Sequence, residues 1–196
     1  MIFGFLKSLF KKSRPLGDVQ LRPYKNEDHP SVLRLIESRY PEIGTQLDLQ
    51  GSEIDLTDID YYWRKCGGEF MVLTRKEEII GCICARPLKE RRFCAEFDWF
   101  FLRKNEEGKG LGLILLNWAL EWCRQKDIRI IELWSSEKRT STHKIYRKIG
   151  FKHNGIKKLW RDNPPHYVLY FELDLLDSKT KLCHERYRKL LENIGY

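Results

Sequence analysis

The sequence predicts a single α+β domain with a mixed, largely antiparallel central sheet flanked by helices. The length of 196 residues fits one domain with short extensions. With 42% hydrophobic and 33% charged residues, the composition is that of a folded globular chain, and no apolar run reaches the roughly 20 residues of a membrane-spanning helix. Strand-like runs dominate the first half, whereas strands and helices alternate in the second, which is typical of a mixed α+β fold.

The first half is expected to form most of an antiparallel sheet. Strand patterns cover residues 19–23, 70–74, 79–85 and 93–102, with charged turns at 75–78 and 87–92. Helical spacing of apolar residues covers 30–39 and 55–65; Pro41 ends the first helix and Gly67 with Gly68 breaks the second. The last three strands therefore form a meander.

The second half begins with a glycine-rich turn that opens a long helix from Leu111 to about residue 126. A strand at 129–134, a helix at 140–149 closed by Gly150, strands at 151–160 and 166–174 and a last helix at 179–193 follow. The predicted organisation is a basic amphipathic arm at 1–17, a domain at 18–176 and a helical extension at 177–196.

The first 14 residues carry four positive charges and no negative ones. These charges follow the apolar stretch, whereas a secretory signal places them before it. The arm is compatible with weak contact to a membrane surface, and also with docking on its own domain or on a partner. The arm and the C-terminal helix are candidates for homodimer contacts.

The six cysteines are scattered, and no C-x-x-C pair occurs. Most lie inside apolar runs, which predicts small buried residues in a reducing compartment and no metal site. We therefore expect a cytoplasmic protein.

A turn with three glycines, Glu107-Gly-Lys-Gly-Leu-Gly112, lies between a predicted strand and a predicted helix. Alternate glycines allow positive φ angles, so successive backbone N–H groups can line one concavity where the helix N-terminus adds its partial positive charge. This predicts a main-chain pyrophosphate site. Because Lys109 is not followed by Ser or Thr and G-x-G-x-x-G is not met, the turn is neither a P-loop nor a dinucleotide fingerprint. The alternative interpretation of the glycines alone is a tight turn with a solubilising Lys109.

The charge balance also favours an anionic partner. Lys and Arg exceed Asp and Glu by 36 − 28, or +8. Residues 138–161 include nine basic residues and no acidic one. Such a run is compatible with a solvated face or with contacts to the phosphates.

The strand, the glycine turn, the long helix, the next strand and the segment Thr142-His-Lys-Ile-Tyr-Arg-Lys-Ile-Gly-Phe151 together resemble the GNAT superfamily of acetyl-CoA-dependent N-acyltransferases. The resemblance covers about residues 19–175, with specific motifs within 96–151. The family turn Q/R-x-x-G-x-G/A is matched at Gly110 and Gly112, with Glu107 in place of Gln or Arg. The later block is matched at Tyr146, Gly150 and Phe151, whereas Arg139 and Thr142 replace the usual Asn and Ala.

The resemblance implies a GNAT-like fold, acetyl-CoA as co-substrate and no metal. It assigns the CoA pyrophosphate to the turn residues Gly108, Lys109, Gly110, Leu111 and Gly112, chiefly through backbone N–H groups. The main chain around Leu102 would bind the pantetheine arm and the acetyl carbonyl. Tyr146 would protonate the departing CoA thiolate, and the candidates for phosphate contacts are Arg139, Lys144 and Arg147.

Acetyl transfer to an amine through a tetrahedral intermediate needs a neutral amine, but a lysine-like amine with a pKa of about 10.4 is almost fully protonated at pH 7. Glu96 and Asp98 are two residues apart on one strand and share a face, so either, directly or through water, is a candidate base. We favour Glu96 of the two; an exposed polar strand face is the alternative. His143, three residues before Tyr146, is expected on the surface.

Residues 41–60 include six acidic residues and no basic one, and lie where the family binds its acceptor. A negative field there favours a cationic amine such as a polyamine, an aminoglycoside, a lysine or an N-terminal amine, although a solvated loop explains the charges equally well.

Two other functions remain open. One is a basic nucleic-acid-binding module, less favoured, that would use residues 138–161 with stacking by Trp134, Tyr146, Phe151 and Trp160. The other is a GNAT-like protein that binds CoA without catalysis.

Overall fold

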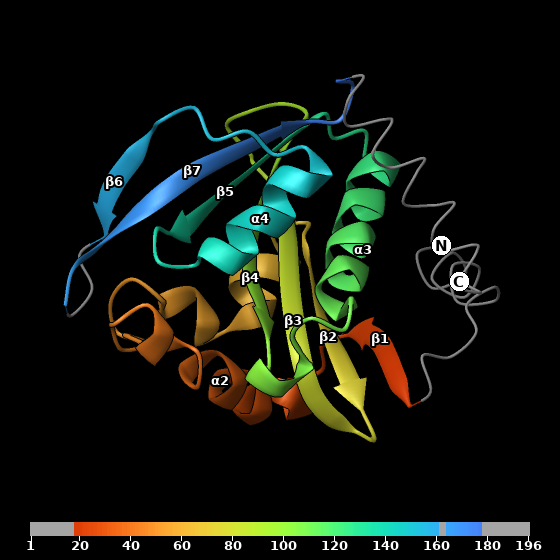
Figure 1. Ribbon diagram of the computed structural model, residues 1–196. Helices are drawn as coiled ribbons and strands as arrows, with labels where there is room; N and C mark the ends of the chain where they lie inside the picture. Colours follow the sequence, from red (N-terminus) through yellow and green to blue (C-terminus); the bar gives the residue numbers. More distant parts are fainter. Residues whose placement is uncertain (1–17, 161–163, 178–196) are drawn as a thin grey trace.

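The computed structural model describes residues 18–160 and 164–177. Its centre is a seven-stranded sheet with the order β1-β2-β3-β4-β5-β7-β6 (Figure 1). The strands are β1 (Val19–Pro23), β2 (Glu69–Arg75), β3 (Glu78–Pro87), β4 (Cys94–Leu102), β5 (Ile130–Ser136), β6 (Lys157–Trp160) and β7 (His166–Asp174). Only the β4–β5 pair of this described sheet is parallel. The predicted fold class is therefore confirmed; the predicted arm at 1–17 and the helix at 179–193 lie outside the described residues.

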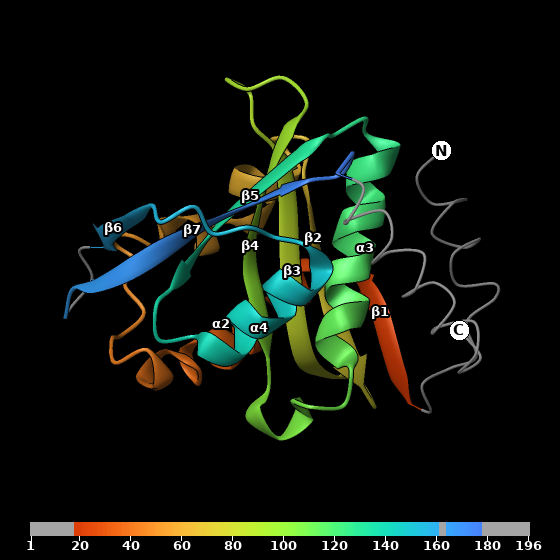
Figure 2. The ribbon, with the colours of Figure 1, turned by 45° about the horizontal axis from the view of Figure 1, so that its top comes forward.

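Helices cover both faces of the sheet (Figures 1 and 2). On one face lie α3 (Leu111–Gln125) and α4 (Thr140–Ile149), which pack apolar residues such as Leu115 and Ile149 onto the sheet. On the other face lie α2 (His29–Glu37) and the short turns η1 (Asn26–Asp28) and η2 (Tyr40–Glu42). Two separate clusters of buried residues, one on each face, form the core.

Two predicted elements are shorter in the structure. The helix expected at 55–65 is replaced by η3 (Ile54–Leu56) and a single π-helical turn, η4 (Asp60–Arg64). Here the Asp55 carboxylate accepts the indole N–H of Trp63 and of Trp99, each at 2.9 Å. These two hydrogen bonds hold the segment in its non-helical conformation. The strand expected from residue 151 begins only at β6, because Gly155 turns the chain with a φ of 86°.

An irregularity in β4 divides its residues between the two faces of the sheet. The pairing of β3 with β4 shifts register between Cys82 and Cys84, and Trp99 has a φ of 51°. This β-bulge places two successive residues, Asp98 and Trp99, on the α2 face. The α3 side of the strand carries Phe100, which belongs to the opposite cluster of buried residues.

The strands β4 and β5 pair only over a short stretch. Cys94 to Glu96 face Ile130 to Glu132, and beyond Glu96 the two strands diverge (Figures 1 and 2). The second half of β4 therefore has a main-chain edge that no neighbouring strand of the described sheet covers.

The described cysteines are free thiols, of which Cys82, Cys84, Cys94 and Cys123 are buried. Burial raises the pKa of Cys82 to about 12, so its thiol is unreactive at neutral pH. The part of the chain that the structure describes has no helix long and apolar enough to cross a bilayer. Among these residues there is also no group of three side chains suited to hold a metal ion.

Candidate active site

The glycine turn follows β4 and the short helix η5 (Lys104–Glu106) and ends where α3 begins. Gly108 and Gly110 have φ angles of 77° and 81°, the left-handed conformation that favours glycine. A Cβ added at either position would have no heavy atom within 4 Å, so a group bound against the turn could approach its backbone closely. At Gly112 the reason for glycine is packing, because a Cβ there would lie 3.1 Å from the Phe100 ring.

The turn offers backbone donors at the start of α3. No side chain caps this helix end, where Gly110 is the N-cap residue. Within the described chain, the N–H groups of residues 108–112 donate to no carbonyl outside the helix, and only the next one, that of Leu113, returns to the Gly110 carbonyl at 3.1 Å. Uncapped donors and the positive end of a 15-residue helix suit a diphosphate, so the residues present fit the group that the sequence predicts.

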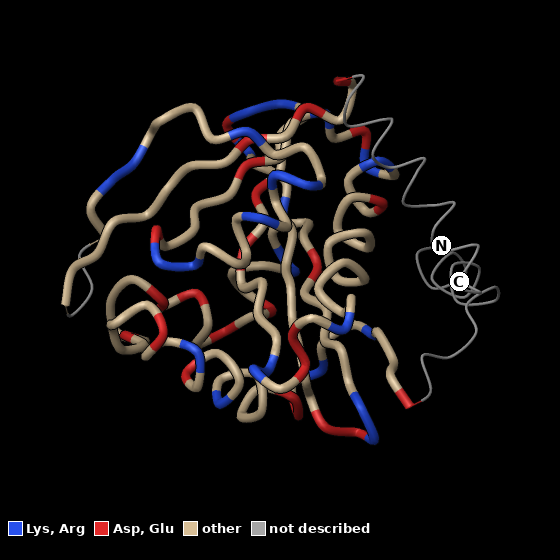
Figure 3. Tube along the Cα trace, in the orientation of Figure 1, with Lys and Arg blue, Asp and Glu red and all other residues tan. Residues whose placement is uncertain are grey.

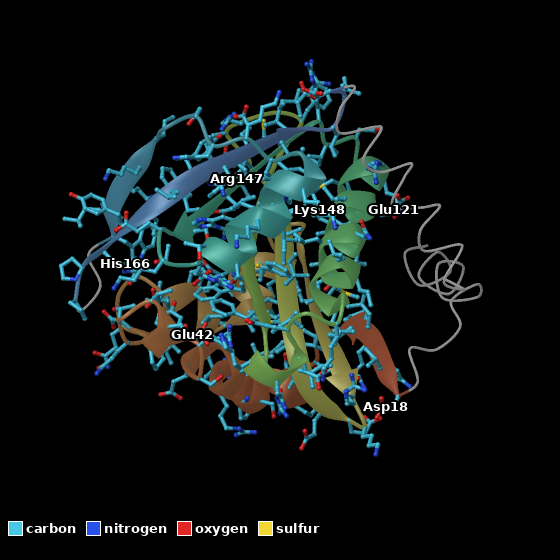
Figure 4. The ribbon with its side chains drawn as sticks, in the orientation of Figure 1. Asp18, Glu42, Glu121, Arg147, Lys148 and His166 are labelled. Carbon is cyan, nitrogen blue, oxygen red and sulfur yellow. The ribbon has the colours of Figure 1, made fainter. Side chains whose placement is uncertain are left out.

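Glu107, which replaces the usual Gln or Arg, is neutralised by its neighbours. Its carboxylate pairs with Arg39 from the end of α2 and lies 3.6 Å from the Lys104 ammonium group. Arg39 also binds Glu42 at 2.9 Å, which connects the turn to the segment after α2; Figure 4 labels Glu42. This negative charge therefore does not oppose a phosphate at the turn.

The side chain of Lys109 is held on the turn itself. Its ammonium group lies 3.2 Å from the carboxylate of Glu106, which also binds Arg75 at 3.1 Å. The side chain of Lys109 is therefore paired, which leaves its backbone N–H for the predicted site.

The uncovered edge of β4 lies beside the turn. The N–H of Arg103 bonds to the Ile80 carbonyl at 2.8 Å, so Arg103 directs its main-chain groups to β3. Because successive residues of a strand point their main-chain groups to opposite sides, Phe100 and Leu102 direct theirs away from β3. The Phe100 carbonyl does so, since it accepts a hydrogen bond from Arg139 at 2.8 Å. The main chain at Leu102 therefore faces the divergence of β4 and β5, as a pantetheine-binding role requires.

Tyr146 lies on the α4 side of this divergence. It is only 3% exposed, and its ring contacts Phe100, Phe151 and Phe171 at centroid distances of 6.0, 5.5 and 5.5 Å. Among the described residues, no hydrogen bond holds its hydroxyl. Burial raises the pKa of Tyr146 well above the ordinary value of a phenol, so the hydroxyl keeps its proton at neutral pH.

Glu96 and Asp98 both lie on the α2 face of β4, but their surroundings differ. Glu96 accepts two hydrogen bonds from Arg86, at 3.0 and 2.8 Å, and is thereby held as an ion pair. Asp98 has no salt bridge within the described chain; its Oδ1 accepts the Trp99 N–H at 2.7 Å. Burial, reinforced by the charges of Glu96 and Asp55, raises the pKa of Asp98 well above the usual value of a carboxyl. The geometry therefore favours Asp98 over Glu96 as the base.

Asp55 is a member of this group that the sequence did not single out. Its carboxylate binds the two tryptophan indoles, and burial raises its pKa despite these bonds. It comes from the acidic segment 41–60, so at least one charge of that segment lies beside the candidate base rather than in solvent.

The basic residues predicted near the phosphates lie in different environments. Lys144 and Arg147 are exposed on α4, where Figure 4 labels Arg147. Arg139, the N-cap residue of α4, is partly buried and lies over the ring of Phe101 with its guanidinium carbon 4.3 Å from the centroid. Their contacts with phosphates stay predictions.

The surface position expected for His143 is wrong. His143 is 2% exposed and its Nε2 lies 3.1 Å from the Ser135 hydroxyl. Tyr146 and Phe151 are also buried, at 3% and 2% exposure. These two rings are therefore not available for stacking on the bases of a nucleic acid.

Burial of His143 gives the fold a pH dependence. Desolvation, followed by the charges of Arg147 and Arg139, lowers the pKa of His143 to about 4 from an ordinary value near 6.5. The unfolded chain therefore binds a proton that the folded one does not, and stability is lost as the pH falls from about 6.5 towards 4. We expect His143→Gln, which keeps a hydrogen-bonding group, to remove about 2–3 kcal/mol of this loss. Denaturant unfolding over that pH range measures the free energy of unfolding of both proteins. If this free energy falls equally with pH in the native protein and in His143→Gln, the assignment to His143 is contradicted.

Comparison with known proteins agrees with this geometry. The model of the acetyltransferase (GNAT) family matches residues 30–151, which is more than half of the chain. The chain belongs to this family, and the resemblance predicted from the sequence is confirmed.

Similar proteins include an uncharacterized N-acetyltransferase of Methanocaldococcus jannaschii, 31% identical over 71 residues, which are 36% of this chain and 31% of that protein. The N-acetylaspartate synthetase of Xenopus tropicalis is 29% identical over 103 residues, covering 52% of this chain and 38% of that protein. The chain thus spans about a third of the length of these curated relatives.

Solved structures share the fold. An acetyltransferase from Streptococcus agalactiae 2603 has a TM-score of 0.70 at 19% identity, over 81% of this chain and 99% of its own. A putative acetyltransferase from Salmonella typhimurium, solved with its cofactor acetyl-CoA, has a TM-score of 0.65 at 13% identity, over 82% and 95%.

Proposed function

We propose that the protein is an acetyl-CoA-dependent N-acetyltransferase that transfers the acetyl group to a primary amine by direct attack. The observation that carries the proposal is the uncapped, glycine-lined start of α3 beside the uncovered edge of β4. Membership of the acetyltransferase family and the names of the relatives, which include an N-acetylaspartate synthetase, support N-acetylation as the reaction.

Acetyl-CoA supplies an activated acetyl group as a thioester. The backbone N–H groups of Gly108, Gly110, Leu111 and Gly112 bind its diphosphate, and the main chain at Leu102 orients the pantetheine arm and the acetyl carbonyl. This arrangement holds the thioester in the divergence of β4 and β5, with Tyr146 on the α4 side and Asp98 on the α2 face.

Two side chains move the protons. Asp98 accepts a proton from the incoming ammonium group, directly or through one water, so that a neutral amine attacks. As the N–C bond forms and the C–S bond breaks, the Tyr146 hydroxyl protonates the leaving thiolate. The nitrogen loses two protons: the first passes to the Asp98 carboxylate before attack, and the second leaves as the tetrahedral intermediate collapses and restores the Tyr146 phenol, whose own proton is now on sulfur. The Asp98 proton then passes to solvent, so one proton is released for each acetyl group transferred.

The acceptor is expected on the α2 face, next to residues 41–60. Figure 3 shows acidic residues of this segment near the basic start of α4, and an ideal Cβ on Gly44 would lie 2.6 Å from the Lys138 ammonium nitrogen. Asp55 and Asp98 would attract the ammonium group of the acceptor to this face.

The test combines acetyl-CoA binding with an acceptor screen that detects released CoA thiol. We expect acetyl-CoA to raise the melting temperature of the full chain and at least one class of amine to release thiol. Binding without turnover for any amine would support the non-catalytic alternative. No effect of acetyl-CoA, together with salt-sensitive retention on RNA, would refute the proposal in favour of nucleic-acid binding.

A further inference from the structure

Among the described residues, Arg139 is a partly buried cation with no carboxylate partner. Within the described residues, every other buried or partly buried arginine pairs with a carboxylate; these are Arg22, Arg39, Arg64, Arg75, Arg86 and Arg103. In the part of the chain that the structure describes, the guanidinium of Arg139 contacts the Phe100 carbonyl and the ring of Phe101 and pairs with no carboxylate. A guanidinium has five N–H donors, so most of its hydrogen-bonding capacity is left over.

The guanidinium of Arg139 reaches across the edge of β4. Its backbone belongs to α4, which packs on the α3 side of the sheet, whereas the Phe101 ring beneath it belongs to the cluster on the α2 face. There Phe101 stacks between Trp99 and Tyr40 at centroid distances of 6.3 and 6.4 Å. Arg139 therefore presents its charge above an aromatic surface on the face where the acceptor is expected.

The same face carries the opposite charge a short distance along β4. Asp98 lies three residues before Phe101, directly before Trp99, and it has no salt bridge in the described chain. Both Asp98 and Arg139 are close enough to Tyr146 to shift its pKa, in opposite directions. Within the described residues, a carboxylate and a guanidinium that both lack an ion-pair partner thus lie at the same part of β4, near the proposed acid.

A purely cationic acceptor would satisfy Asp98 but would be repelled by Arg139. An acceptor that carries both an amine and a carboxylate satisfies both groups, since Arg binds a carboxylate through two parallel hydrogen bonds. We propose that the acceptor is an amino-carboxylate of the amino-acid class, whose carboxylate binds Arg139 while its amine lies at Asp98. This inference rests on the proposed acetyltransferase function. The products are the N-acetylated amino-carboxylate and free CoA.

The test compares acceptors that differ only in the carboxylate. Pooled L-amino acids, the matching pool of amino acid amides, and spermidine are each incubated with the full chain and acetyl-CoA, with CoA thiol and acetylated products measured. The amides keep the amine and the side chain, and their amine loses its proton more readily, so a preference for the free acids reflects carboxylate recognition. We expect at least tenfold higher kcat/KM for the acids.

The variant that tests the assigned residue is Arg139→Gln. We expect KM for the preferred amino acid to rise about 10- to 100-fold, with KM for acetyl-CoA changed less than twofold. Arg139→Lys, which keeps the charge but not the planar fork, should give a smaller rise. The control variant is Arg124→Gln, which removes an exposed charge in the last turn of α3, away from the glycine turn. It should leave both KM values unchanged.

The outcomes separate this inference from the function on which it rests. If spermidine or the amides are acetylated as well as the acids, or if Arg139→Gln raises KM for acetyl-CoA instead, the amino-carboxylate proposal is wrong while the acetyltransferase stands. If acetyl-CoA does not bind, or no acceptor releases thiol, the acetyltransferase proposal itself fails. A melting scan of each variant identifies a loss of activity caused by unfolding.

Discussion

Replacing Asp98 by Asn should lower kcat/KM for amine acetylation about 10²- to 10⁴-fold, the contribution typical of a general base. Asn is of similar size and keeps an oxygen to accept the Trp99 N–H, so the bulge of β4 is expected to survive the substitution. Steady-state kinetics with the best amine from the screen measures the loss. The matched control is Asp127→Asn, an exposed residue at the end of α3 with a φ of 54° that Asn tolerates.

The raised pKa of Asp98 also predicts the direction in which kcat/KM changes with pH. Because the pKa of Asp98 is raised, the base loses its proton only at a pH above the usual carboxyl range. The kcat/KM of the native protein should therefore rise through a limb at that higher pH, and the limb should be missing in Asp98→Asn.

The pH dependence of folding stability that Asp98 causes should have the opposite sign to the one that His143 causes. The folded protein binds the Asp98 proton more tightly than the unfolded chain, so stability falls as the pH rises from the ordinary pKa of a carboxyl through the raised one. Asp98→Asn should therefore be the more stable protein at neutral pH. If Asp98→Asn stays active and its pH profile of kcat/KM keeps the same acidic limb, the base is another residue, and Glu96 is the first alternative.

Replacing Tyr146 by Phe should lower kcat about 10²-fold or more while KM for acetyl-CoA stays within a factor of two. The ring contacts with Phe100 and Phe171 remain, and no described residue bonds to the hydroxyl, so the fold loses little. Tyr24→Phe is the matched control, since it removes the hydroxyl of another tyrosine, 4% exposed, on the α2 face.

A thiol with poorer leaving ability reveals the role of this proton. If Tyr146 donates it, the loss in Tyr146→Phe should grow when the thiol released from the thioester is more basic. A variant that keeps the native kcat would show that the thiolate leaves without this proton. A variant that loses kcat and acetyl-CoA binding together would assign Tyr146 to packing of the pantetheine channel.

The sequence predicted the sheet and the main helices because their signals are local. Short continuous apolar runs mark β2 and β3, and the spacing of leucines marks α3, whose start at Leu111 coincides with the glycine turn. The helix expected at 55–65 failed because the bonds of Asp55 to Trp63 and Trp99 join residues up to 44 positions apart. No periodicity in a single segment reports such a contact.

The candidate site was predicted in its main-chain part and only partly in its charges. Gly110 and Tyr146 follow from motifs, but the choice between Glu96 and Asp98 depends on Arg86, which reaches Glu96 from the neighbouring strand β3. The neutralisation of Glu107 by Arg39 also joins distant segments. For Arg139, the sequence offered only a charge within a basic run, and its lack of a carboxylate partner among the described residues follows from the fold.

The most direct test of the account is the affinity for acetyl-CoA of Gly110→Ala compared with Gly155→Ala. Both glycines have positive φ angles, 81° and 86°, and open space around a new Cβ, so both variants carry similar backbone strain. Only Gly110 lies in the turn that is proposed to bind the diphosphate. Calorimetric titration should show at least a tenfold loss of affinity for Gly110→Ala and a native value for Gly155→Ala. Equal affinities in the two variants would contradict the main-chain diphosphate site.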